Sequence, residues 1–303
     1  MLPAALAVLA AIAIAARASY PRYLEQRASR RRPLGPDGIV LGAAAIELER
    51  AGAHGVLLLH GAGDTPQVLA DMAAYLHRRG FAVRVPLLSG HGRSLSAFSM
   101  VSSAHWHEDV EHEYASMRDR HDWVAVVGLS MGGALAVILA ARRDDVPALV
   151  LLAPYIAMPA GLRAAAVTSG LWGALSPYFL SRGGRSIHDR AAAARGRGHG
   201  LFTPAALRAL YDVVADAAND VAKVRAPTLV IQSREDNRIS RANAERGFAR
   251  LGSREKRLHW IEGAGHVITV DFGHERVFEL TADWLDKHAE SQARTRAKDP
   301  FNG

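Results

Sequence analysis

The chain has 303 residues, 49% of them hydrophobic and 22% charged, and its mean hydropathy is near zero. This is the composition of an ordinary soluble globular protein, long enough for one large α/β domain, and it excludes disordered, collagen-like and polytopic membrane proteins. The formal net charge of +7 comes from residues 1–33 and 287–303, because residues 34–286 carry equal numbers of acidic and basic side chains. A basic groove for nucleic acid is therefore not expected. The absence of cysteine excludes disulfides, a thiol nucleophile and cysteine-ligated zinc.

Residues 1–16 form an uncharged apolar stretch, and arginines follow it at Arg17 and at residues 30–32. At about 1.5 Å per residue the stretch would span roughly 24 Å, slightly less than a membrane-spanning helix requires. A signal anchor fits the basic flank and would leave the body on the cytoplasmic side, so we expect membrane association through residues 1–16. A secretory signal cleaved near Ala18 and a stretch without membrane role remain as alternatives. Residues 28–38, rich in Arg, Pro and Gly, are predicted to be a linker.

From residue 44 onward, short apolar runs alternate with helical patterns. The runs predict strands at residues 44–48, 56–59, 82–85, 124–127, 149–152, 229–231 and 258–261. The first helix is predicted to start at Pro66 with Thr65 as its N-cap and to end at Gly80. Further helices are predicted around residues 106–117, after residue 133, over 242–251 and over 277–285. This alternation predicts an α/β fold with a mostly parallel, doubly wound sheet.

The alternation breaks between Pro154 and Pro227, over a stretch too long for a simple crossover. We predict a helical cap inserted over the carboxyl ends of the strands, where open α/β sheets bind ligands. The apolar and aromatic side chains of this stretch fit either an acyl pocket or the core of the cap itself. The predicted units are an apolar N-terminal segment and basic linker (1–36), a core (37–154 and 226–288), the cap (155–225) and a polar C-terminal tail (289–303).

The strongest chemical signal is the sequence Gly128-Leu129-Ser130-Met131-Gly132, which lies directly between a predicted strand and an Ala-rich predicted helix. A serine on a sharp strand-to-helix turn is the arrangement of a nucleophile elbow. The glycines at 128 and 132 remove side chains that would clash across this turn. The helix that follows aims its first amides at a developing oxyanion.

A second signal is His60-Gly61-Ala62-Gly63, at the end of the apolar run 56–59. Glycines in this position let the backbone turn so that an amide points at a substrate carbonyl oxygen. We assign the two oxyanion-hole amides to Ala62 and Met131. His60 is expected to support the loop by hydrogen bonding.

A serine hydroxyl needs a base, and the base needs an orienting carboxylate. Asp236 and His266 each follow a predicted strand and lie in the chain order nucleophile, acid, base. Glu235 is the competing acid, whereas His259 lies within a strand and His274 at a helix start. We therefore predict a triad of Ser130, Asp236 and His266.

With these motifs, residues 37–288 resemble the α/β-hydrolases of the bacterial carboxylesterase and monoacylglycerol lipase group. The resembling segments are 57–61 (LLLHG), 86–92 (PLLSGHG), 128–133 (GLSMGG), 153–154 (AP), 226–229 (APTL) and 265–271 (GHVITVD). The resemblance implies the α/β-hydrolase fold, the same triad and the same oxyanion hole. It implies a structural role for His91 in the loop 90–92.

The expected function is hydrolysis of a short or medium acyl ester or a monoacylglycerol, with no cofactor and no metal. An aminopeptidase, with Asp212, Asp216 or Asp220 as holders of a substrate ammonium group, is one alternative. Acyl transfer to another alcohol and a non-catalytic, ligand-binding hydrolase fold are the others. The expected partner is an ester with an apolar acyl chain, and the oligomeric state is left open.

Overall fold

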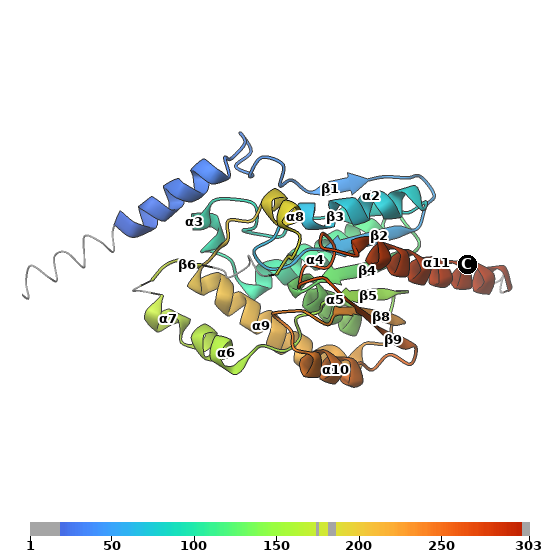
Figure 1. Cartoon of the computed structure of the whole chain (residues 1–303). Coiled ribbons are helices and arrows are strands. Elements are labelled where there is room, and N and C mark those ends of the chain that lie inside the picture. Colours follow the sequence, from blue (N-terminus) through green and yellow to red (C-terminus); the bar gives the residue numbers. More distant parts are fainter. Residues whose placement is uncertain (1–18, 174–175, 181–185, 299–303) are drawn as a thin grey trace, which may run out of the picture.

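A computed structural model describes residues 19–173, 176–180 and 186–298 (Figure 1). The apolar stretch 1–16, which we expect to associate with a membrane, lies outside the described residues. Within those ranges no helix combines the length and the apolar character needed to cross a bilayer.

A central sheet of seven strands runs through the molecule in the order β1-β3-β2-β4-β5-β8-β9. Only the edge strand β1 is antiparallel to its neighbour, so the predicted mostly parallel sheet is confirmed. All seven predicted strands form, and their bounds are β1 Ile46–Leu48, β2 Gly55–Leu59, β3 Ala82–Val85, β4 Val124–Leu129, β5 Leu149–Leu152, β8 Thr228–Ser233 and β9 Lys256–Ile261.

Helices cover both faces of this sheet. On one face lie α2 (Ala70–Arg78) and α11 (His274–Lys298), and on the other α4 (Ser103–Arg118), α5 (Met131–Arg142) and α10 (Arg241–Arg250). Alternate side chains of β2 point to opposite faces. Val56 and Leu58 therefore pack with the first pair of helices, and Leu57 and Leu59 pack with the second group. This is why the central strands are continuous apolar runs rather than alternating ones.

The first predicted helix differs at its start. Residues Pro66–Leu69 form a tight 3₁₀ turn, η1, and the α-helix α2 begins only at Ala70. Thr65 has the extended backbone of an N-cap, but its side chain accepts no capping hydrogen bond. The reason is that the Val68 amide, which the hydroxyl would have capped, donates instead to the Thr65 carbonyl oxygen at 3.2 Å. The prediction of Thr65 as a side-chain cap was wrong.

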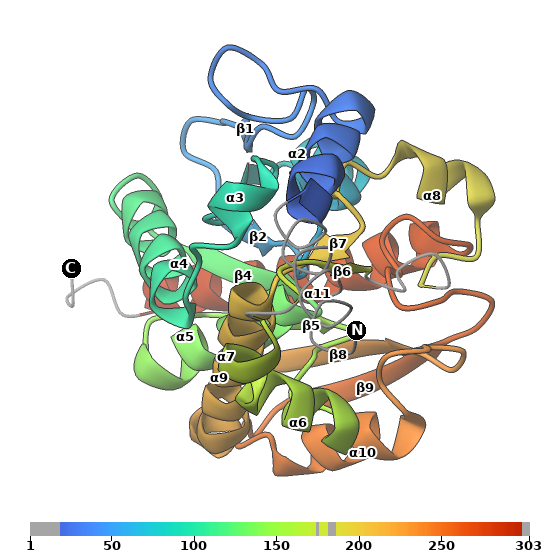
Figure 2. The same cartoon turned by 90° about the vertical axis from the view of Figure 1, so that its left-hand side faces the viewer.

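Four helices and a two-stranded sheet lie between β5 and β8 and gather at one end of the molecule (Figure 2). They are α6 (Ala160–Val167), α7 (Ser169–Trp172), β6 (Phe179–Leu180), α8 (Arg190–Arg195), β7 (Leu201–Phe202) and α9 (Pro204–Asp220). Thr203 caps α9 by accepting from the Ala206 amide at 3.1 Å, and its hydroxyl donates to the Phe98 carbonyl, next to α3 (Leu95–Phe98). The inserted segment is thus hydrogen-bonded to the body.

The segment before the core is not the linker that the sequence predicts. Residues 19–31 are helical, so a helix occupies the first part of the range 28–38. Leu24 and Ala28 are buried against Leu95 of α3 and Leu201 of β7. Arginine has a high helix propensity, and packing of this apolar pair stabilises the helix further.

Candidate active site

The sharp turn after β4 carries Ser130. Its backbone has φ 55° and ψ −115°, a conformation that few non-glycine residues adopt. A Cβ atom at Gly128 would lie 2.2 Å from the Gly132 carbonyl oxygen, and one at Gly132 would lie 2.1 Å from the Leu59 carbonyl oxygen. Neither approach is possible for a larger residue. The two glycines therefore let the strand and the helix pass close enough to hold the serine in its strained turn.

Ser130 begins a line of three side chains at the carboxyl ends of the strands. His266 Nε2 lies 2.8 Å from Ser130 Oγ, and His266 Nδ1 lies 2.8 Å from Asp236 Oδ2. A proton on Nδ1 satisfies the carboxylate and leaves Nε2 as the acceptor that faces the hydroxyl. Strand register explains the proximity of acid and base, because Ser233 at the end of β8 is paired with Ile261 at the end of β9.

The Asp236 side chain is fully buried and hydrogen-bonded on both oxygens. Burial alone would raise the pKa of this carboxyl, but hydrogen bonds from His266 and from the amides of Ile239 and Arg238 outweigh it and hold the pKa below its ordinary value. The carboxylate is therefore charged when it orients the imidazole. Glu235, the competing acid, accepts from the Gly263 amide at 3.1 Å and makes no contact with His266.

The loop after β2 lies beside the serine because Leu59 is paired with Gly128 of β4. His60 Nδ1 is 2.9 Å from the Gly61 carbonyl oxygen. A trans peptide points its N–H opposite to its carbonyl, so this contact aims the Ala62 amide away from His60. Among the described residues no group accepts a hydrogen bond from that amide. Met131, the first residue of α5, has an amide without an intrahelical acceptor, and these two donors flank Ser130.

His60 and His91 lie behind this loop and do not reach the serine. The ring of His60 is fully buried and its Nε2 accepts from the Leu88 amide at 3.2 Å. Burial lowers the pKa of His60 to about 4 and holds the pKa of His91 well below its ordinary value. The two rings meet edge to face, with centroids 4.9 Å apart. Both histidines are thus neutral packing residues that fix the loop.

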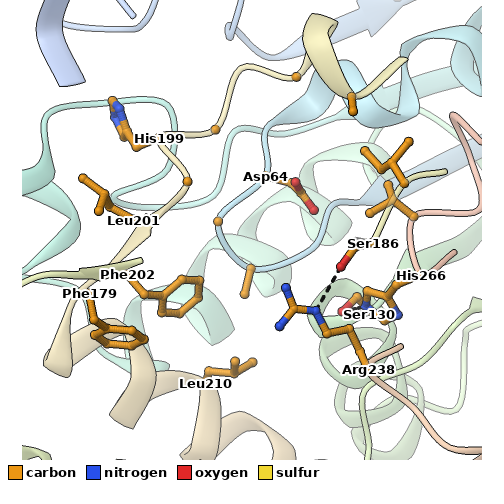
Figure 3. A pocket seen from close by; sticks show the side chains of 18 of the residues that line it. Asp64, Ser130, Phe179, Ser186, His199, Leu201, Phe202, Leu210, Arg238 and His266 are labelled. Atoms are coloured by element: carbon orange, nitrogen blue, oxygen red, sulfur yellow. Dashed lines mark hydrogen bonds between the residues drawn. The ribbon is translucent and has the colours of Figure 1, made fainter. Parts of the chain in front are cut away.

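A cavity of about 730 Å³ opens above Ser130 (Figure 3). One side of it is apolar and is built by the inserted segment, through Phe179, Phe202, Leu207 and Leu210. Gly63 makes a close approach to this side, because a Cβ atom there would lie 3.0 Å from the Phe202 ring. The other side is polar and includes the two triad members that face the cavity. The cavity can therefore take an amphipathic molecule with its reacting bond at Ser130.

Two charged residues on the polar side were missed by the sequence reasoning. Asp64 directly follows the loop 60–63, and the adjacency to that motif was the signal that could have found it. Arg238 follows the triad acid, and its Nε donates to Ser186 Oγ at 3.0 Å. Burial raises the pKa of Asp64 to about 6, against the opposing influence of His266 and Arg238. Asp64 therefore changes charge near neutral pH within sight of the triad.

Asp271 joins the inserted segment to the loop of the catalytic histidine. Its carboxyl accepts from the amides of Gly265 (2.7 Å), His188 (2.8 Å), Asp189 (2.9 Å) and Phe272 (2.9 Å). These four bonds outweigh the effect of burial and hold the pKa of Asp271 below its ordinary value. The residue is part of the segment 265–271 quoted above, but its role needed the structure.

Asp212, Asp216 and Asp220, the candidate ammonium holders, lie on α9 and do not line the cavity. They form ion pairs with Arg208, His107 and Lys223 respectively. The alternative that assigned an amine subsite to them is therefore wrong in its residues. In the described ranges no group of three or more His, Asp or Glu side chains is placed to hold a metal ion.

Comparison with known proteins gives a family and several relatives. Residues 52–272 match the family described as serine aminopeptidase, S33. A thermostable monoacylglycerol lipase of Bacillus sp. (strain H-257) is 28% identical over 250 residues, which cover 82% of this chain and 97% of that protein. A carboxylesterase of Bacillus subtilis (strain 168) is 28% identical over 246 residues, 78% of this chain and 94% of that protein.

Solved structures repeat the pattern. A structure described under the metagenome-derived lipolytic enzymes LipS and LipT has a TM-score of 0.76 and 26% identity, covering 82% of this chain and 100% of that one. The monoacylglycerol lipase of Paleococcus ferrophilus has a TM-score of 0.70 at 20% identity, over 80% of this chain and 98% of that one, which shows the shared fold.

Proposed function

The chain belongs to the serine aminopeptidase, S33 family of α/β-hydrolases, and we propose that Ser130 is the nucleophile with which it cleaves carboxylic esters through an acyl-enzyme. It is a carboxylic ester hydrolase, as are the lipase and the carboxylesterase that it resembles over most of their length. The observation that carries the proposed mechanism is the unbroken line of hydrogen bonds from Asp236 through His266 to Ser130, on the floor of a partly apolar cavity.

Acylation begins when His266 Nε2 accepts the Ser130 proton and Oγ attacks the ester carbonyl carbon. The carbonyl oxygen takes up the electron pair and rests between the amides of Ala62 and Met131. Asp236 stabilises the imidazolium that forms and keeps its orientation. The tetrahedral intermediate collapses, His266 gives its proton to the leaving alkoxide, and the alcohol departs.

Deacylation repeats these steps with water. His266 takes a proton from water, the hydroxide attacks the acyl-enzyme, and the same two amides hold the oxyanion. Collapse returns the proton from His266 to Ser130 Oγ and releases the carboxylic acid. Each preorganised donor contributes a factor on the order of 10²–10³ to the rate.

The proposed substrates are short or medium acyl esters and monoacylglycerols. Phe179, Phe202, Leu207 and Leu210 offer an apolar surface for an acyl chain. Asp64 and Arg238 lie on the opposite side, where an alcohol with hydroxyl groups finds both an acceptor and a donor.

The test is a kinetic series with the Ser130→Ala variant as control. Hydrolysis of p-nitrophenyl acetate, butyrate, octanoate and dodecanoate, and of monoacylglycerols, is measured beside dipeptide p-nitroanilides. We expect turnover of the esters, little turnover of the amides, and loss of nearly all ester turnover in Ser130→Ala. Preference for the amides, or full activity of the variant, would contradict the proposal.

We also propose that residues 1–16 attach the enzyme to a membrane with the catalytic body on the cytoplasmic side. The support is the uncharged apolar run with arginines on its C-terminal flank. Introducing arginine at Ile12 and Ile14 together should release the enzyme from the membrane fraction of cells, whereas Leu41→Arg, at an exposed position of the body, should not. Equal membrane association of all three proteins would contradict this proposal.

A further inference from the structure

The helix at residues 19–31 lies outside the segment 52–272 that matches the family, yet it forms part of the substrate cavity. Ala28 and Arg31 from this helix, and Arg32 directly after it, line the same cavity as Ser130. Figures 1 and 2 both place the helix beside α3 and α8, at the end of the molecule that carries the inserted segment. The cavity is thus completed by chain that the family model does not include.

Apolar packing holds the middle of this helix. Leu24 is 6% exposed and Ala28 7% exposed, and both pack against Leu95 of α3 and Leu201 of β7. Positions 24 and 28 are one turn apart on the same face of a helix, so a single stripe makes this contact. Tyr23 and Ser29, their neighbours in sequence, are exposed.

Polar contacts fix the helix on both sides of that stripe. The Glu25 carboxylate accepts from the Leu95 amide at 3.1 Å and from the Tyr178 hydroxyl at 3.2 Å. Burial and the nearby Glu25 raise the pKa of Tyr178 to about 12, so this hydroxyl keeps the proton that it donates. Arg32 Nε donates to the Gly198 carbonyl oxygen at 3.5 Å. The helix is therefore joined to α3 and to the segments before β6 and β7.

The position of closest interest is Ala28. It lines the cavity together with Leu201, whose neighbour Phe202 belongs to the apolar side. Alanine is the smallest side chain that a helix tolerates without loss of propensity. Any larger side chain at this position would extend into the cavity or push the helix off Leu201.

We propose that residues 19–32 form a wall of the acyl-binding side of the cavity and that Ala28 sets the space left for long acyl chains. This rests on the proposed ester hydrolysis and adds a specificity-determining element to it. A chain long enough to reach Ala28 gains apolar contact with the helix, whereas an acetyl group remains near Ser130 and does not.

The first experiment compares Ala28→Trp with Ser29→Trp in the full-length enzyme. The measured quantity is the ratio of kcat/KM for p-nitrophenyl dodecanoate to that for p-nitrophenyl acetate. In Ala28→Trp the ratio should fall about tenfold or more, because the indole occupies space that a long chain needs and differences of this kind in apolar pockets are worth 10–200-fold. Ser29→Trp places the same side chain on the exposed face and should leave the ratio unchanged.

The second experiment undocks the helix. Leu24→Asp puts a charge against Leu95 and Leu201, and it should raise KM for the dodecanoate ester much more than it changes kcat for it. Tyr23→Asp, at a position that is 56% exposed, is the matched control and should change neither. Thermal melting of all four variants separates a local effect on the wall from a general loss of folding.

Three outcomes would overturn the proposal. One is an unchanged chain-length ratio in both Ala28→Trp and Leu24→Asp, with melting temperatures that show folded enzyme. Another is an equal fall of the ratio in Ser29→Trp. The third is an effect that follows the alcohol part, seen when alkyl butyrates of increasing alcohol length replace the acyl series. In each case acetate hydrolysis by the unmodified enzyme shows separately whether the proposed function holds.

Discussion

The catalytic edge of the sheet and the roof of the cavity are built in different ways. The catalytic edge comprises the loops that carry Ser130, Asp236, His266 and Ala62, and the roof comprises residues 155–225 together with the helix at 19–31. At the edge, backbone atoms pass so closely that only glycine fits at positions 128 and 132. In the roof, apolar side chains from separate segments meet across the cavity.

This difference separates chemistry from specificity. The edge is held by strand pairing and short hydrogen bonds, so a change there should affect every substrate alike. The roof contacts the part of the substrate away from the reacting bond, so a change there should affect substrates according to their length. Asp271 and Asp64 lie where the two regions meet, and substitutions at them test how independent the regions are.

The largest effect is expected at the triad acid. Asp236→Asn should lower kcat about 10⁴-fold for acetate and dodecanoate esters alike, because the imidazole loses its charged partner and its correct tautomer. Glu235→Gln is the matched control and should retain activity, since Glu235 does not contact His266. Equal losses in the two variants, measured by steady-state kinetics, would remove the distinction between these carboxylates.

Gly132→Ala should have the next largest effect. The new Cβ atom would lie 2.1 Å from the Leu59 carbonyl oxygen, and the resulting shift of the elbow misplaces both nucleophile and oxyanion donors. We expect kcat to fall on the order of 10³-fold for all chain lengths. Gly161→Ala, in α6 of the roof, meets nothing within 4 Å and should leave kcat unchanged. A normal kcat in Gly132→Ala would contradict the account of the elbow.

Asp271→Ala tests the connection between edge and roof. Loss of the carboxylate leaves four amides without their acceptor, and we expect the free energy of unfolding to fall by about 3 kcal/mol. Asp189→Ala removes only the cap of α8, which accepts from Ala191 and Ala192, and should cost about 1 kcal/mol. Urea denaturation measures both. Equal small losses would show that Asp271 does not hold the two regions together.

Asp64→Asn should produce the smallest effect, and one that depends on pH. Burial raises the pKa of this carboxyl from 3.8 to about 6, so the unfolded chain loses this proton first as pH rises. The native state therefore loses stability between these two pH values and stays penalised above pH 6. At pH 8 the variant should be more stable by roughly 2 kcal/mol, and below pH 4 this advantage should vanish.

The check is the free energy of unfolding measured across this pH range for Asp64→Asn and for Asp144→Asn, an exposed control. A gain in stability that is the same at pH 4 and pH 8, or one shared by the control, would show that Asp64 is not the group that titrates. The groups that face Asp64 are His266 and Arg238, so their own variants complete the series.

The sequence predicted the catalytic edge well because its determinants are local. Apolar runs marked every strand of the central sheet, and the triad residues follow three of these strands within a few positions. In a parallel sheet the carboxyl ends lie at one edge, so residues distant in sequence are brought together without further information. The backbone clash at Gly132 is likewise visible as a fixed spacing around Ser130.

The roof was less predictable because its determinants are long-range. The pairing of Leu24 and Ala28 with Leu201 joins segments about 170 residues apart, and arginine-rich sequence around Ala28 suggested a linker instead of a helix. The Thr65 cap was mispredicted because a 3₁₀ turn uses a backbone carbonyl where a hydroxyl was expected. Asp271 could not be assigned a role until the position of His188 was known.

The most direct test of the central claim is covalent labelling of the native enzyme with a fluorophosphonate, followed by mass spectrometry of its peptides. The account predicts one adduct, on Ser130, absent from Ser130→Ala and formed much more slowly in Asp236→Asn. An adduct on a different serine, or ester hydrolysis that survives complete labelling of Ser130, would contradict it.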